Sequence, residues 1–440
     1  MLHILGALPI GLAIAAAYRQ QRYYLFVFLG LAAYHVLGLL SLPSLTTEFD
    51  TQVLLRNEMI TLSGAVLLFI SVSAIERCFP KQQVASENPI RSAGDQWAVY
   101  AACVATCLAL ISVIIARRGA SLFEGTWEEF RQESSRLDAV ATLLQYLVIP
   151  SAWVAYRAGR RLSSGILLVF GLFIFGVLGS RAALLTLPAI IAIDVLRSAT
   201  HRRINRFAVV TLIAAALLLH TGGRIVRGVG IGGVYRILSG ASLTSSEIGD
   251  LFQGIDWTGG ESEVIRYFSV VSRDSPVPEI PPLVSVTRWI TIYLPRELSG
   301  GLKPEDSSYV LWRHSANVGV FEEYQSWPDM LTLLQAGETG SVHPTLWGEA
   351  WLNGGLPAML VFCLLLGLIL VGVDRVLALL PPVVAALAAP AVVSGYLMVA
   401  RGNSVIGLGY VAYLIPVALA LVLAVSRLHV IFASGVGRRL

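Results

Sequence analysis

Residues 353–373 read NGGLPAMLVFCLLLGLILVGV, a run that contains no charged side chain. A helix rises about 1.5 Å per residue, so roughly 20 apolar residues cross the hydrocarbon core of a bilayer. Similar runs recur along the chain, at 2–18, 23–42, 54–75, 97–116, 139–156, 163–179, 182–197, 207–220, 376–400 and 405–426. We therefore predict an all-α polytopic membrane protein with about eleven transmembrane helices.

The composition of the whole chain agrees with this prediction. Its 440 residues are 55% hydrophobic and only 14% charged, and the mean hydropathy is +0.70. Soluble domains are typically about 25% charged. The net charge of +4 is small, so we predict no nucleic-acid partner. Residues 1–18 lack a basic leader and a clear cleavage site, so we interpret them as the first span and not as a signal peptide.

Basic residues in the short loops set the expected orientation, because cytoplasmic loops are enriched in Lys and Arg. Four loops on one side and the C-terminal tail hold most of the basic residues, which are Arg19, Arg22, Arg77, Lys81, Arg91, Arg157, Arg160, Arg161, Arg197, Arg202, Arg203, Arg206, Arg427, Arg438 and Arg439. The opposite loops include the acidic turn 48–50. We expect the N-terminus outside and the C-terminus in the cytoplasm, which requires an odd number of spans.

A long loop divides the chain into three regions. Residues 1–220 hold the first eight spans, residues 221–341 form the loop on the outer side, and residues 342–440 hold the last three spans and a cytoplasmic tail. The loop carries mixed charge and many aromatic residues, which a disordered low-complexity segment would lack. We expect an ordered cap of short helices, because loops of this length are usually functional.

Arginines near the outer membrane edge are the first candidate site residues. Arg181, Arg224, Arg227 and Arg401 all lie at or beside the outer ends of predicted spans. A guanidinium group binds phosphate oxygens in a two-pronged manner and keeps its charge. Such a cluster at headgroup depth suits a lipid-linked phosphate or pyrophosphate. The alternative for each arginine is simple interfacial anchoring.

His343 and Glu349 stand where the outer loop enters the span at 353–373. Histidine titrates near neutral pH and can accept a proton from a reacting group. Ionisable groups are rare in such apolar segments and often functional. The alternative is that both residues cap and anchor the helix. Arg296 and Lys303, in a loop rich in Gly and Pro, could hold an anionic or sugar ligand, or form a solvated turn.

Several kinds of chemistry find no support in the sequence. It has no phosphate-binding P-loop, no dinucleotide-binding glycine turn and no zinc-protease motif. Cys103 and Cys107 share a helix face, but no second Cys/His pair completes a metal site, so we interpret them as packing residues. We predict no cofactor and no metal.

The arrangement of spans, the late outer loop, Gly179-Ser180-Arg181 and the stretch from Pro295-Arg296 to Lys303-Pro304 resemble the O-antigen polymerase (Wzy) family. This resemblance covers the topology of nearly the whole chain, although its motifs are short. The related O-antigen ligases have a histidine followed eleven residues later by a glycine, and His343 and Gly354 have that spacing. Proline follows the histidine here, where ligases often have asparagine, and Glu349 and Asn353 look more like the polymerase pattern.

The resemblance implies a metal-independent glycosyltransferase of the membrane-embedded GT-C type in the bacterial inner membrane. It would polymerise oligosaccharide repeat units carried on undecaprenyl pyrophosphate, on the periplasmic side, together with a possible chain-length regulator protein. His343 or Glu349 would accept the proton from the attacking hydroxyl. The residues expected to hold pyrophosphates or sugars are Arg181, Arg224, Arg227, Arg266, Arg296, Lys303 and Arg401.

Two alternatives stay open. An O-antigen ligase would transfer the glycan once, to lipid A core, instead of building a ladder of chain lengths. A lipid-linked oligosaccharide flippase or other transporter would show charged residues within its spans and repeat symmetry.

Overall fold

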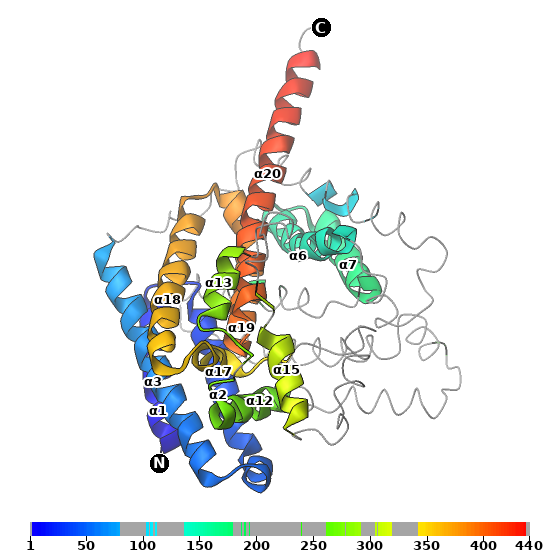
Figure 1. The fold of residues 1–440 in the computed structure, drawn as a ribbon. Coiled ribbons are helices and arrows are strands. Elements are labelled where there is room, and N and C mark those ends of the chain that lie inside the picture. Colours follow the sequence, from blue (N-terminus) through cyan, green and yellow to red (C-terminus); the bar gives the residue numbers. More distant parts are fainter. Residues whose placement is uncertain are drawn as a thin grey trace. The chain divides into compact units, whose positions relative to one another are not determined.

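The computed structural model describes residues 2–79, 136–178, 261–277, 279–291, 304–305, 307–318 and 342–436, with single residues and short pieces between 103 and 239. Every regular element in these residues is an α-helix (Figure 1). The chain divides into two compact units, each assembled from distant stretches of sequence. The first comprises Met1–Gln82, Thr258–Val376 and Gly395–Gly409, and the second comprises Gln83–Trp257, Leu377–Ser394 and Tyr410–Leu440.

Long helices occupy the predicted spans where the structure describes them. They are α1 (Leu2–Arg19), α2 (Leu25–Glu48), α3 (Thr51–Cys78), α6 (Arg136–Arg157), α7 (Arg161–Leu178), α18 (Gly355–Leu379), α19 (Pro382–Arg401) and α20 (Ser404–Val436). Five helices among the described residues are long and apolar enough to cross a membrane, within α2, α3, α18, α19 and α20. The all-helical fold is thus confirmed for the described residues, and the length and composition of these helices support a membrane protein. The number of eleven spans stays a prediction, and the span at 207–220 lies outside the described residues.

One face of α18 shows how an apolar helix can be exposed. Leu356, Leu360, Leu364 and Leu368 follow each other at four-residue spacing and are each about half exposed. The other face is packed, because Met359, Phe362 and Leu366 are fully buried. Contiguous exposed leucine is unfavourable in water, whereas lipid tails are as apolar as the side chain itself. The exposed stripe is therefore suited to contact with lipid.

In the first unit, helix ends that the sequence assigns to the cytoplasmic side contact one another. Arg22, in the turn between α1 and α2, forms an ion pair with Glu76 near the end of α3 (3.0 Å). The Asp374 carboxylate, near the end of α18, accepts a hydrogen bond from the backbone N–H of Tyr23 (2.8 Å). These contacts join three helix ends whose flanking loops the charge pattern assigns to the cytoplasm.

Short helices are found in the long loop, as expected from the sequence. They are α12 (Glu261–Asp274), α13 (Val284–Thr291) and α15 (Ser307–Asn317), and α17 (Thr345–Leu352) follows them. In the first unit, α12 contacts α2, α3, α15 and α17. Their shared apolar core includes Phe49 of the α2–α3 turn, Val271 of α12, Leu311 of α15 and Leu352 of α17. Burial of these side chains, at roughly 25 cal/mol per Å² of apolar surface, holds the loop helices to the bundle.

The second unit is described by its own contacts alone. Helices α6 and α7 pack against each other. The rings of Tyr146 in α6 and Tyr410 in α20 lie with their centroids 4.8 Å apart. None of the predicted site residues within the described part of the chain belongs to this unit.

Candidate functional site

The predicted start of the span at 353–373 is a junction between two helices. Helix α17 ends at Leu352, and α18 begins at Gly355. Gly354 and Gly355 have φ values of +127° and +70°, which glycine adopts readily and other residues do not. The span predicted at 353–373 is occupied by α18, and a short separate helix, which the sequence did not predict, precedes it and carries Glu349.

Asn353 fastens this junction to the loop helix α13. Its Oδ1 accepts the backbone N–H of Ser285 (2.8 Å), and its Nδ2 donates to the Glu349 carbonyl (2.6 Å). The Asn353 carbonyl also accepts the N–H of Leu283 (2.8 Å). Since Asn353 is fully buried, these bonds fix the direction in which α17 leaves α18.

His343 lies just before α17, is buried, and is held by a residue that the sequence analysis did not single out. Asn403 accepts the backbone N–H of Ile406 through Oδ1 (3.3 Å), so its Nδ2 donates to Nε2 of His343 (3.1 Å). This orientation makes Nε2 an acceptor, which assigns the neutral imidazole to His343. Burial, and then the charge of Arg401, hold the pKa of His343 well below its usual 6.5. The geometry and the electrostatics agree on a neutral histidine.

Glu349 is almost fully buried and is committed to another helix. Its Oε1 accepts the Ser404 hydroxyl (2.5 Å), and its Oε2 accepts the Ser404 backbone N–H (3.0 Å). The Ser404 Oγ in turn accepts the indole N–H of Trp289 (2.8 Å). Ser404 begins α20, so the carboxylate caps the positive end of that helix. The sequence placed Glu349 at the start of the span at 353–373, whereas its carboxylate serves the start of α20.

Arg401 joins this group from the C-terminal end of α19. A cation is favourable there because the last carbonyl groups of a helix carry partial negative charge. The turn after it depends on Gly402, whose φ is +92°. A Cβ on Gly402 would lie 2.4 Å from the carbonyl oxygen of Thr345. This close approach brings the 401–404 turn against the start of α17, so His343, Glu349 and Arg401 share one site.

The remaining predicted residues fall elsewhere. Arg266, on α12, pairs with Glu48 at the end of α2 (2.6 Å) on the exposed surface. It shares the first unit with the His343 site, and α12 packs against α17. The others, Arg181, Arg224, Arg227, Arg296 and Lys303, lie outside the described residues.

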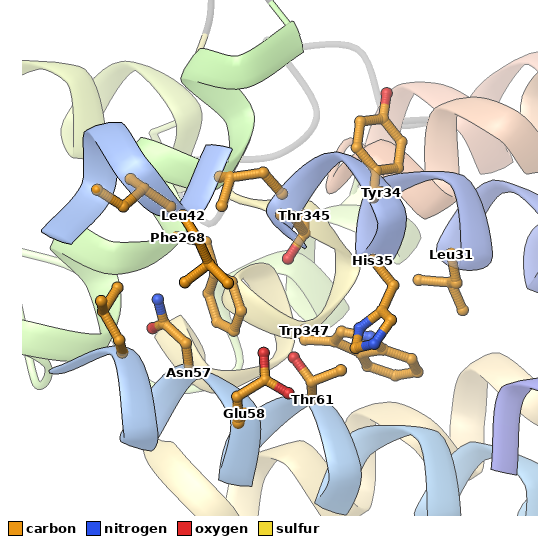
Figure 2. A pocket seen from close by; sticks show the side chains of 14 residues that line it. Leu31, Tyr34, His35, Leu42, Asn57, Glu58, Thr61, Phe268, Thr345 and Trp347 are labelled. Atoms are coloured by element: carbon orange, nitrogen blue, oxygen red, sulfur yellow. The ribbon is translucent and has the colours of Figure 1, made fainter. Parts of the chain in front are cut away.

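A pocket beside α17 was missed by the sequence analysis. It has a volume of about 50 Å³ and lies among α2, α3, α12 and α17. Figure 2 shows the Glu58 carboxylate and the Thr61 hydroxyl of α3 pointing into a space that His35 of α2 and Thr345 of α17 also border. His35 and Glu58 are ionisable residues within apolar segments, and this was the sequence signal for the pocket. Their meeting depends on the rotation of two helices, which sequence does not give.

Comparison with known proteins finds no family model, no curated protein and no solved structure that matches this chain. The family resemblance therefore rests on the sequence features alone.

Proposed function

We propose that this protein is a membrane glycosyltransferase that polymerises oligosaccharide repeat units carried on undecaprenyl pyrophosphate, at the periplasmic face of a bacterial inner membrane. The observation that carries the proposal is a buried His343 that is held neutral by Asn403 and lies close enough to Arg401 to be affected by its positive charge. Eleven spans and a GT-C-like architecture are part of this proposal.

In this proposal Arg401 stabilises the pyrophosphate leaving group. Catalysis of such a transfer consists largely of positioning and of fixed positive charge aimed at the charge that develops on the leaving oxygen. Arg181, Arg224, Arg227, Arg266, Arg296 and Lys303 supply the further cations. Periplasmic chemistry has no nucleotide sugar, so the activated donor is the lipid pyrophosphate itself.

His343 is the proton acceptor in this proposal, and Glu349 positions the site. Nε2 of His343 already acts as a hydrogen-bond acceptor, so it has a lone pair for the proton of the attacking hydroxyl once Asn403 releases it. Both carboxylate oxygens of Glu349 are held by Ser404. The new bond joins the acceptor oxygen to the anomeric carbon, and the pyrophosphate departs with the electron pair.

The decisive experiment incubates purified protein in nanodiscs with a lipid-linked repeat unit, without nucleotide sugar, with and without a chelator. A ladder of chain lengths that persists under chelation is expected. One transfer to lipid A core would indicate a ligase, and movement of the lipid across the bilayer without a new glycosidic bond would indicate a flippase. Either result would refute the polymerase.

Two variants test the site within that assay. His343→Gln should reduce chain growth by about 10²–10⁴-fold, the usual contribution of a placed base. His314→Gln is the matched control, because the partly buried His314 of α15 pairs with Asp274 of α12 (3.0 Å) and not with a residue of the site. Arg401→Gln is compared with Arg313→Gln in the same way. Full activity of folded His343→Gln and Arg401→Gln would remove both residues from the mechanism.

A further inference from the structure

The pocket beside α17 has a lining that selects for one kind of ligand. Its polar residues are Tyr34 and His35 of α2, Asn57, Glu58 and Thr61 of α3, and Thr345 of α17. Its apolar walls include Leu31, Leu54, Phe268 and Trp347. Among the residues that the structure describes, no lysine or arginine lines it. Without a fixed cation, the pocket is unsuited to a phosphate group.

One buried atom in the pocket points to a ligand that donates hydrogen bonds. Asn57 is 7% exposed, and its Nδ2 donates to Oγ of Ser269 (2.8 Å). Ser269 in turn donates to the carbonyl of Ile265 (3.1 Å), so Ser269 is the acceptor for Asn57. The Oδ1 of Asn57 is then left as a buried acceptor with no protein partner. Such an atom usually has a partner in water or a ligand.

The other polar groups of the pocket also favour a ligand that carries hydroxyl groups. The Glu58 carboxylate is an acceptor and is partly exposed to the cavity, and Oγ1 of Thr345 accepts the N–H of Gly348 (3.3 Å), which leaves its O–H to donate. Acceptors with hydroxyl groups beside them, and aromatic walls, match the hydroxyl groups and the apolar ring face of a sugar.

The size of the pocket limits the enclosed part of the ligand to a portion of one sugar ring. A water molecule needs about 10–15 Å³ on the same measure, so about 50 Å³ accepts a few hydroxyl groups and not an oligosaccharide. Thr345 and Trp347 belong to the helix that carries Glu349, and His343 lies two residues before Thr345. The pocket and the proposed reaction site therefore share helix α17.

We infer that this pocket binds one neutral sugar residue of the saccharide substrate, through Asn57, Glu58 and Thr61, while the phosphates stay with the arginines. The inference rests on the proposed function for the source of the saccharide. The binding itself is testable without any transfer reaction.

Two variants alter the pocket in different ways, and each has a matched control. Glu58→Gln removes the charge, with Glu305→Gln as the control on the exposed surface near α15. Gly6→Ala narrows the pocket, because a Cβ there lies 3.2 Å from Cε1 of His35 and 3.6 Å from Oε2 of Glu58. Gly11→Ala is its control on the same helix, since nothing lies within 4 Å of that Cβ. Thr61→Ala replaces Glu58→Gln if the latter does not fold.

The experiment uses saturation-transfer NMR to measure binding of glucose, galactose, N-acetylglucosamine and rhamnose to the full chain. The protein is held in nanodiscs because glucoside and maltoside detergents carry sugars themselves. Binding of at least one neutral sugar is expected, and Glu58→Gln and Gly6→Ala should weaken it about tenfold, whereas both controls should stay within about twofold of the wild type.

Four results would overturn the inference. The first two are that no neutral sugar binds, or that the two pocket variants bind sugar as tightly as the wild type does. The other two are that only glucosamine or another ammonium compound binds, or that inorganic pyrophosphate displaces the sugar from the wild type and the pocket variants alike. Sugar binding without chain growth would refute the proposed function and leave the pocket standing. Chain growth, together with unaltered sugar binding in both pocket variants, would refute the pocket assignment and leave the proposed function standing.

Discussion

The carboxylate of Glu349 accepts both the hydroxyl and the backbone N–H of Ser404, 55 residues further along the chain. The bonds measure 2.5 and 3.0 Å, and both groups are buried. A single side chain on the short helix α17 therefore determines where α20 begins.

This cap predicts the behaviour of Glu349 variants. Glu349→Ala leaves buried donors without an acceptor and should lower the free energy of unfolding by about 2–4 kcal/mol. Glu349→Gln keeps one acceptor and should cost less. In a double-mutant cycle, Ser404→Ala and Glu349→Ala together should cost less than the sum of the two single losses. Equilibrium unfolding in micelles measures this, and a stable Glu349→Gln that has lost all chain growth would show that Glu349 is the base instead.

The neutral state of His343 predicts a dependence of stability on pH. Its folded pKa is lowered by burial and by Arg401, so the unfolded chain binds a proton near pH 6.5 that the folded chain does not. The contribution of His343 is therefore fully present above about pH 6.5 and is lost as the pH falls below it. Thermal unfolding midpoints at pH 7.5 and 5.5 should fall further apart in the wild type than in His343→Gln. An equal fall in both proteins would contradict a neutral buried histidine.

The close contact between Gly402 and Thr345 predicts opposite effects at the two positions. Gly402→Ala places a Cβ against a backbone carbonyl that cannot turn away, which should cost more than about 2 kcal/mol. Thr345 has a φ of +62°, which a β-branched residue rarely adopts. Thr345→Asn keeps an acceptor for the N–H of Gly348 and should stabilise the chain by about 1 kcal/mol.

Gly355→Ala is the control for these two variants. Its φ of +70° is similar to that of Gly402, but no atom lies within 4 Å of the new Cβ. It should therefore show the cost of the backbone conformation alone, about 1 kcal/mol. A loss in Gly402→Ala no larger than this would mean that the turn is not packed against α17.

The orientation of the helices can be tested by labelling of single cysteines in a background in which Cys78, Cys103, Cys107 and Cys363 are replaced. Gln20 and Thr46 are both exposed and lie at opposite ends of α2 and its preceding turn. An impermeant maleimide should label Thr46→Cys in right-side-out vesicles and Gln20→Cys in inverted vesicles. The opposite pattern would place the long loop in the cytoplasm and exclude periplasmic chemistry.

The helical bundle could be predicted from the sequence because a membrane helix needs only length and apolar composition. Residues 353–373 have both, and α18 is found there. The separate helix α17 was not predicted, because Asn353-Gly354-Gly355 can either end a helix or be tolerated inside a membrane helix. The hydrogen bonds between Asn353 and Ser285 decide between these options, and they join segments 68 residues apart.

The candidate site could be predicted only as far as its ionisable residues. His343, Glu349 and Arg401 were named from their types and their position near an apolar segment, and the structure brings them together. Asn403 and Ser404 carry no charge, so nothing in their types marked them out. Glu58 and His35 line one pocket because α2 and α3 each pack against α1, and this depends on helix rotation and not on spacing along the chain.

The hydrogen bond from Tyr23 to Asp374 has a consequence for biogenesis, since 351 residues separate its partners. The N-terminal end of α2 leaves the ribosome early, but its carboxylate acceptor is synthesised only with the last quarter of the protein. Until then this end of the first hairpin lacks the carboxylate that binds it in the complete chain. Chains truncated ahead of residue 374 should therefore be degraded in cells faster than chains truncated after α18.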